Sequence, residues 1–251
     1  MDDELPDPIP AATLIVMRPA AAGGAPDILM LQRSETMAFA AGALVFPGGR
    51  IDEADRRAAA RLAPRLEDGA ERIAAVRETI EETGVAPALA GSPDAEALRA
   101  GLAEGRDFAG LLEKQGLRLD LGALTPFARW CPNFREARRF DTMFYLTEAP
   151  AGAEAHSADR TETVHTFWAP ASDVLARIEG GTAKAIFPTR RNLERLARFG
   201  SIEEARADAA RYPVRKITPW VEERNGGRFV CIPEGWGYPV TAEAYESARR
   251  R

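Results

Sequence analysis

The chain has 251 residues, of which 45% are hydrophobic and 28% charged, so it is long enough to bury a core and has the composition of a globular protein. Its formal net charge of -5 disfavours a nucleic-acid backbone as the main partner, because proteins that bind one present a basic surface. The two cysteines, Cys131 and Cys231, form neither a disulfide framework nor a zinc pattern, which favours a reducing compartment. The acidic, proline-containing start is not a signal peptide, and no apolar run reaches the roughly 20 residues of a membrane helix, so we expect a soluble cytoplasmic protein.

The first third of the chain begins with strand patterns and continues into a helix. Apolar runs at 13–18 and 28–32, joined by a glycine-containing loop, predict a β-hairpin. A third run at 43–46 ends sharply at Pro47-Gly48-Gly49. Residues 71–83 carry apolar side chains at helical spacing, and Gly84 follows them as the usual residue just past a helix end.

The rest of the chain mixes helices and strands. In chain order we expect helices at 94–102 and 108–115, strands at 125–130, 141–146 and 163–168, helices at 171–178, 189–199 and 202–211, and a strand at 228–232. Strands with intervening helices predict an α/β or α+β fold with a mixed sheet.

A cluster of carboxylates on the helix at 71–83 carries the chemistry. Glu78 and Glu82 are four residues apart and share a helix face, and Glu81 lies beside them. Three crowded carboxylates repel one another, and a hard cation such as Mg²⁺ or Mn²⁺ would relieve that repulsion. The alternative is a solvated acidic helix face, which is common. The strand and Pro-Gly-Gly turn upstream favour the metal site.

This segment resembles the signature of the Nudix family, GX5EX7REUXEEXGU, where U is a bulky apolar residue. Gly49 matches its first glycine, Asp55 stands at its first glutamate, and Arg77-Glu78, Glu81-Glu82 and Gly84-Val85 match its second half. Between Asp55 and Arg77 lie 21 residues, 56–76, where the signature has seven, so 14 are inserted. We expect the insertion to lengthen the loop before the helix, at little cost in closure entropy.

The segment upstream is similar to a motif of the coenzyme A diphosphatase branch of the family, LLTXR(S/A)X3RX3GX3FPGG. Residues 29–34 begin it, Gly42 falls in register, and Phe46-Pro47-Gly48-Gly49 completes it. Leu31 replaces the threonine of the motif, and Ala38 replaces its second arginine.

The resemblance implies roles for individual residues. It implies metal binding by Glu78, Glu81, Glu82 and the backbone carbonyl of Gly48, with Glu81 as a ligand or as the base that activates water. Arg77 would orient the glutamates by charge-assisted hydrogen bonds. Many members use a further acidic residue from a distant loop, for which Glu162 is the candidate, in competition with Asp159 and Glu154.

The substrate-binding candidates are arginines and their neighbours near these motifs. Arginine suits bidentate phosphate contacts, although a surface ion pair is the alternative for each. Aromatic side chains could stack on a base, although they are more often part of a core. The candidates are Arg33, Ser34, Phe39, Arg138 and Arg139, with Trp130 and Phe134 as further aromatic side chains.

The resemblance as a whole implies a single Nudix α/β/α sandwich with a mixed sheet, whose core spans about 12–187, and a helical C-terminal extension over about 188–251. It implies Mg²⁺- or Mn²⁺-dependent hydrolysis of a diphosphate linkage in a small nucleotide, with coenzyme A or an acyl-CoA first and ADP-ribose or a dinucleotide next. A non-catalytic nucleotide-sensing domain is the alternative, although such domains typically lose glutamates of the signature. A homodimer is compatible with the resemblance, and neither a nucleic acid nor a membrane is expected as a partner.

Overall fold

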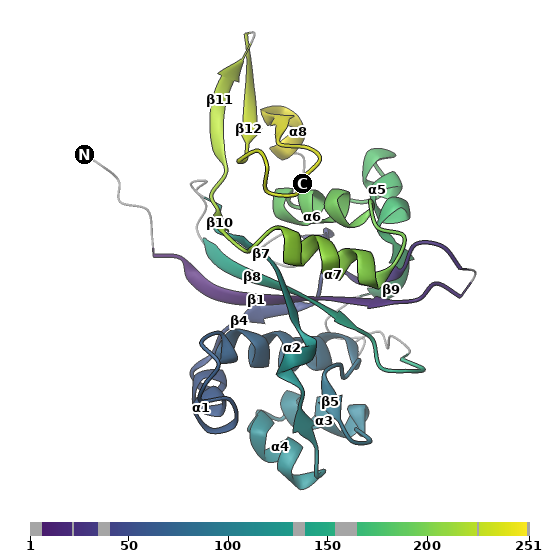
Figure 1. Ribbon diagram of the computed structural model, residues 1–251, viewed down its shortest axis with the longest axis vertical. Helices are drawn as coiled ribbons and strands as arrows, with labels where there is room; N and C mark the ends of the chain where they lie inside the picture. The colour runs from purple at the N-terminus through teal and green to yellow at the C-terminus, as the bar shows by residue number, and fades with distance from the viewer. Residues whose placement is uncertain are drawn as a thin grey trace.

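The structure, a computed structural model, describes residues 7–21, 23–34, 41–132, 139–153, 165–224 and 226–249. A mixed sheet of eight strands runs through the middle of this part of the chain (Figure 1). Its strands are β1 (Ile9–Arg18), β2 (Asp27–Gln32), β3 (Leu44–Val45), β4 (Gly48–Arg50), β7 (Thr125–Trp130), β8 (Phe140–Glu148), β9 (His165–Pro170) and β10 (Lys216–Ile217).

The long strand β1 organises the sheet, whose main path runs β10-β7-β8-β1-β2-β3. On one side β1 pairs in parallel with β8 over nine residue pairs, from Ile9 with Phe140 to Met17 with Glu148. On the other side the antiparallel β4 lies beside the beginning of β1, and the antiparallel β2 lies beside its end. The predicted hairpin of β1 and β2 and the predicted mixed sheet are confirmed.

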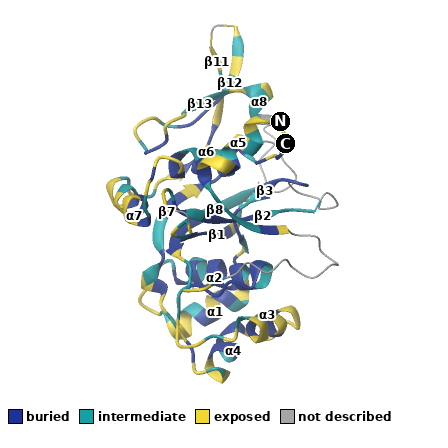
Figure 2. Ribbon diagram, turned by 90° about the vertical axis from the view of Figure 1, so that its right-hand side faces the viewer, coloured by how far each residue is buried: buried dark blue, intermediate teal, exposed yellow. Residues whose placement is uncertain are grey.

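Helices cover both faces of the sheet, which makes the fold a three-layer sandwich (Figures 1 and 2). One face packs against α2 (Gly69–Thr83), with α1 (Glu53–Leu62), α3 (Ala95–Ala103) and α4 (Phe108–Lys114) around it. The other face packs against α5 (Ala171–Glu179), α6 (Phe187–Leu196) and α7 (Ile202–Arg211). A short β5–β6 ladder (Leu89–Ala90, Arg118–Leu119) and a 3-10 turn (Leu121–Ala123) lie near α3 and α4 in the sequence.

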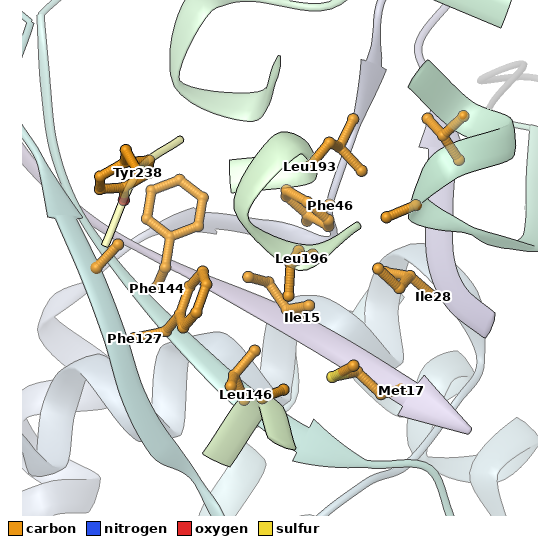
Figure 3. Close-up of a cluster of buried hydrophobic side chains, with 14 of the residues drawn as sticks. Ile15, Met17, Ile28, Phe46, Phe127, Phe144, Leu146, Leu193, Leu196 and Tyr238 are labelled. Atoms are coloured by element: carbon orange, nitrogen blue, oxygen red, sulfur yellow. The ribbon is translucent and has the colours of Figure 1, made fainter. Parts of the chain in front are cut away.

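The alternation of side chains along β1 divides the core into two clusters. Leu14 and Val16 point to the α2 face, while Ile15 and Met17 point to the face covered by α5, α6 and α7. Figure 3 shows the second cluster, where aliphatic side chains of the strands and of α6 meet a group of aromatic rings.

Helix α2 forms where the periodicity of the sequence predicts it. Ile73, Val76 and Ile80 are fully buried, and burial of such side chains contributes roughly 1.5–3 kcal/mol each. The helix ends at Gly84, whose left-handed φ of 69° lets its amide donate to the carbonyl of Ile80. The apolar face therefore anchors the helix and turns the glutamates away from the core.

The insertion between Asp55 and Arg77 is helical rather than a longer loop, so the expectation for 56–76 was wrong. Residues 53–62 form α1, which packs against α2, and Ala58 is buried. The alanine, arginine and leucine residues of this stretch are strong helix formers, and small side chains let the two helices approach closely. Gly69 of α2 would place a Cβ only 3.4 Å from the Cβ atoms of Ala59 and Ala63.

The C-terminal extension, which was expected to be helical over about 188–251, is only partly helical. After α6 and α7 the chain forms a three-stranded antiparallel sheet of β11 (Trp220–Arg224), β12 (Gly227–Cys231) and β13 (Ala242–Ala244), followed by the short helix α8 (Tyr245–Arg249). In Figure 1 this sheet projects beyond the helices that cover the main sheet. Across the described ranges, no helix is both long and apolar enough to cross a membrane.

Candidate active site

The C-terminal half of α2 presents its glutamates to a cavity at one end of the sheet. Glu78 and Glu82 both line this cavity, as their spacing of four residues predicts. The side chain of Glu78 is only 16% exposed and that of Glu81 30% exposed, so these carboxylates are not part of a solvated helix face. Glu81 lies on the same side of the helix but pairs with Arg77 rather than lining the cavity.

Arg77 connects the two halves of the signature. Its guanidinium is 8% exposed and donates from Nε and Nη2 to the two carboxylate oxygens of Asp55, each at 2.9 Å. Nη1 donates to Glu78 at 3.0 Å and to Glu81 at 3.2 Å. Arg77 is therefore no surface arginine: it holds two glutamates of α2 and is itself held by Asp55, as a charge-assisted positioning group would be.

Asp55 stays within hydrogen-bond distance of Arg77 in spite of the insertion, because it lies in the first turn of α1 and the insertion follows it. The carboxylate is 1% exposed and also accepts the backbone N–H of Asp52 at 2.8 Å, across the start of α1. The inserted residues follow Asp55 along α1 and return to α2, so the ends of the insertion stay close together. The bidentate pair of Asp55 and Arg77 thus survives a gap of 21 residues.

Gly48 and Gly49 of β4 let the glutamates come close to the strand. A Cβ at Gly49 would collide with the carboxylate of Glu78, and one at Gly48 would lie 2.7 Å from Cα of Thr13 on β1. The N–H of Gly48 donates to Oε2 of Glu82 at 2.9 Å. The absence of side chains at the Pro-Gly-Gly turn is thus a requirement of the site, as close backbone approach generally demands.

Burial makes both cavity glutamates reluctant to ionise. It raises the pKa of Glu82 to about 8, although the N–H of Gly48 opposes this shift, and the charge of Glu78 adds to it. Burial also raises the pKa of Glu78 to about 7, against the nearby charge of Arg77. Burial would lower the pKa of Arg77, but its hydrogen bond to Asp55 and the charge of Glu78 raise it. Two buried carboxylates of raised pKa form a site that a cation would stabilise.

The cavity has a volume of about 540 Å³. Its base is formed by β1 and β8, on the face of the sheet that α6 covers, and the glutamates of α2 reach it beside β4. Arg33 and Arg139 line it, as does the beginning of α6. Its lining residues are Ala11, Thr13, Arg33, Val45, Phe46, Gly48, Gly49, Arg50, Glu78, Glu82, Pro132, Arg139, Phe140, Thr142, Phe144, Ile186, Pro188 and Thr189.

The donor set fits a magnesium or manganese ion that shares its coordination shell with a substrate. Among the described residues, no three His, Cys, Asp or Glu side chains converge as they would around a metal held by protein alone. Mg²⁺ is usually bound by one or two carboxylates and completes its shell with water and phosphate oxygens. Glu78 and Glu82 supply two buried carboxylates at one cavity wall, and the backbone of Gly48 lies against Glu82.

The structure brings together some of the predicted substrate-binding residues. Arg33 and Arg139 line the cavity, but Ser34, although described, does not. Three other candidates, Phe39, Arg138 and Glu162, lie outside the described residues, as do Phe134, Glu154 and Asp159.

Trp130 is a core residue, so the idea that it stacks on a base was wrong. Its side chain is 1% exposed, and its indole N–H donates to Asn192 at 3.3 Å and to the hydroxyl of Tyr238 at 3.1 Å. Both partners come from the C-terminal extension, whose position the sequence did not predict. Buried indole groups commonly find such a partner within the core.

Several cavity residues were not among the site residues predicted from the sequence. Arg50 follows the two glycines of β4 directly, and Thr13 and Thr142 belong to apolar strands whose polar positions were not assigned a face. Ile186, Pro188 and Thr189 are more than a hundred residues from α2 in the chain. The alternation along β1 and β8 is a signal that could have placed the two threonines on one face.

Comparisons with known proteins support this description. The solved structure of a Nudix hydrolase from Alicyclobacillus acidocaldarius is 32% identical to this chain, with a TM-score of 0.72 over 81% of this chain and 97% of that one. The chicken (Gallus gallus) acyl-coenzyme A diphosphatase NUDT19 is 28% identical over an alignment of 237 positions, which covers 71% of this chain and 63% of that protein. The uncharacterized Nudix hydrolase NudL of Klebsiella aerogenes is 38% identical over 73 residues, 29% of this chain and 54% of that protein. The chain thus spans less than two thirds of either of these two relatives, and no family model matches it.

Proposed function

The chain belongs to the Nudix hydrolase family, and on that premise we propose that it hydrolyses a diphosphate linkage in a nucleoside diphosphate derivative, with coenzyme A or an acyl-CoA as the preferred substrate. The family and the fold class expected from the sequence are confirmed by the Alicyclobacillus structure. The observation that carries the proposed chemistry is the burial of Glu78 and Glu82 in one cavity that Arg33 and Arg139 also line. Such a cavity combines groups for a divalent cation with groups for phosphate oxygens.

We assign the metal to Glu78 and Glu82, with the backbone carbonyl of Gly48 as a further ligand, and of the two roles expected for Glu81, ligand or base, we propose that of the base. When bound, Mg²⁺ or Mn²⁺ would neutralise the diphosphate and lower the pKa of a coordinated water. Arg77 positions Glu78 and Glu81 and, because it is fixed by Asp55, stays in place when the glutamates bind a cation. Arg33 and Arg139 orient the phosphate oxygens by charge-assisted hydrogen bonds.

A water is the nucleophile in this proposal, and the chain forms no covalent intermediate. The water attacks one phosphorus in line, the bridging oxygen leaves with the other phosphoryl group, and the proton passes to a carboxylate. Glu81 is the described residue that we propose as this base, because it is the chain neighbour of Glu82, which lines the cavity, and is oriented by Arg77. Glu162, outside the described residues, stays a prediction for the same role.

The branch assignment rests on the sequence similarity to the chicken acyl-coenzyme A diphosphatase and on the upstream motif. Part of the cavity lining is apolar, since it includes Val45, Phe46 and Phe144. A substrate with a flexible, largely apolar arm beside its diphosphate suits such a lining. ADP-ribose or a dinucleotide is the second choice, and a cytoplasmic location and a homodimer stay predictions.

The test is a chromatographic product screen with Mg²⁺ or Mn²⁺ on coenzyme A, an acyl-CoA, ADP-ribose, NADH and nucleoside triphosphates. We expect Glu82→Gln to lower the rate about a hundredfold or more, because the metal supplies several kcal/mol of transition-state stabilisation. Glu71→Gln, on the same helix but not at the cavity, is the matched control and should keep full activity. Metal binding without hydrolysis of any substrate, or equal rates for the two variants, would contradict the proposal and favour a nucleotide-sensing domain.

A further inference from the structure

The beginning of α6 forms the part of the cavity wall that the metal site does not use. Ile186 precedes the helix as its N-cap, and Ile186, Pro188 and Thr189 all line the cavity. In Figures 1 and 2, α6 lies on the opposite side of the sheet from α2, which carries the glutamates. The first turn of a ten-residue helix therefore borders the cavity that Glu78 and Glu82 enter from the other side.

This first turn lacks partners for its backbone donors. Ile186 has no side-chain oxygen to cap the helix, and Pro188 has no N–H. Within the described ranges, the amides of Phe187 and Thr189 donate to no protein acceptor, and the first amide that does is that of Arg190, to the carbonyl of Ile186 at 3.1 Å. Phe187 and Thr189 are buried, and buried donors at a helix N-terminus need a partner from a cap, water or ligand.

The side chain of Thr189 is a second and independent sign of a ligand. Thr189 is only 3% exposed, and among the described residues no side-chain hydrogen bond to its hydroxyl is found, yet this hydroxyl is not one of the fully enclosed unpartnered groups. What remains exposed of this residue borders the cavity, because Thr189 is one of its lining residues. The hydroxyl is therefore accessible from the cavity rather than enclosed in the core, and polar groups in such a position normally find a hydrogen-bond partner.

We infer that the first turn of α6 is an anion subsite, in which the hydroxyl and N–H of Thr189, a residue of this turn that lines the cavity, bind a phosphoryl group of the substrate. Helix N-termini favour anions because their unpaired amides and the helix dipole both present positive charge. The subsite lies in the same cavity as Arg33 and Arg139, whose cationic side chains add to this preference. The identification of the anion as part of a nucleotide rests on the proposed function.

Two phosphoryl groups have this chemistry: one belongs to the diphosphate, and the other is a phosphate monoester elsewhere on the same substrate. Coenzyme A carries both, whereas 3′-dephospho-coenzyme A carries the diphosphate alone. Comparison of the affinities of coenzyme A and 3′-dephospho-coenzyme A therefore shows which of the two phosphoryl groups binds at α6. ADP-ribose, which also has a diphosphate and no monoester, serves as a third probe with a different leaving group.

The experiment measures the affinities of these three compounds by isothermal titration calorimetry in EDTA, so that no turnover occurs. We expect Thr189→Val to weaken binding about tenfold, the usual effect of one lost hydrogen bond to a charged group. Thr189→Ser, which keeps the hydroxyl, should bind like the wild type. Thr147→Val is the control for replacing a buried threonine, since Thr147 is 2% exposed on β8 and does not line the cavity.

Weaker binding of all three compounds by Thr189→Val would place the diphosphate at α6, and weaker binding of coenzyme A alone would place the monoester there. Unchanged affinities in Thr189→Val, or a wild-type protein that binds none of the three, would overturn the subsite. Hydrolysis measured in parallel with Mg²⁺ separates the two proposals. If binding depends on Thr189 but no compound is hydrolysed, the subsite stands and the proposed activity is refuted. If the compounds are hydrolysed and Thr189→Val binds them as tightly as the wild type, the activity stands and the subsite is refuted.

Discussion

Replacement of Asp55 by asparagine tests whether the buried pair with Arg77 holds the site together. Asp55 is 1% exposed and receives two hydrogen bonds of 2.9 Å from Arg77, which is itself 8% exposed. Asparagine has the same shape but no charge, so it leaves a buried guanidinium without its main anion. Removing one partner of a buried pair costs about 3–5 kcal/mol. Because Arg77 keeps Glu78 and Glu81 as partners, we expect the lower end, about 3 kcal/mol.

The assay is equilibrium urea denaturation, with the thermal midpoint as a second measure. A loss of about 3 kcal/mol corresponds to a fall of roughly 6–12 °C in Tm for a chain of this size. Asp52→Asn is the matched control: Asp52 lies 3.9 Å from the same guanidinium but is 57% exposed, and asparagine caps a helix as well as aspartate does. We expect it to cost less than about 1 kcal/mol. Equal losses in the two variants would refute the reasoning that burial sets the energy of this pair.

Three further predictions concern the site and its surroundings. In EDTA, the free energy of unfolding should fall as pH rises from about 5 to 8. The reason is that Glu78 and Glu82, with pKa values of about 7 and 8, keep protons in the folded state that the unfolded chain has already lost. Urea titrations at several pH values measure this free energy, and a flat or rising profile would contradict the prediction. Gly49→Ala should weaken Mg²⁺ binding about tenfold or more, because its Cβ would displace the carboxylate of Glu78. Calorimetry measures the affinity, and Gly122→Ala, where a Cβ would lie 3.4 Å from its nearest neighbour, is the control. Equal Mg²⁺ affinities of the two variants would count against the close approach of Gly49 and Glu78. Trp130→Phe should lower stability by about 1–2 kcal/mol through the lost indole hydrogen bonds, without a change in KM; a raised KM with unchanged stability would restore Trp130 as a substrate-stacking residue.

Much of the secondary structure was predictable, since local apolar periodicity and glycine or proline punctuation encode it. The strand at 125–130 and the helix at 202–211 have the bounds that were expected. The elements missed were short ones, such as β10 and β13, and the helix α1 inside the insertion. For α1 the helical composition was present in the sequence, but the assumption that an insertion is a loop concealed it.

The sequence by itself determined the carboxylate half of the site, to which we assign the metal, because Arg77, Glu78, Glu81 and Glu82 lie within six residues of one helix and the spacing of a helix places them together. The tertiary structure alone decided the other half. Three features depend on how distant segments pack: Asp55 pairs with Arg77 across an insertion, burial raises the pKa values of the glutamates, and Thr189 lines the same cavity as they do. Local spacing cannot encode them, because desolvation and long-range contacts arise only when the sheet brings residues from far apart in the chain to one end.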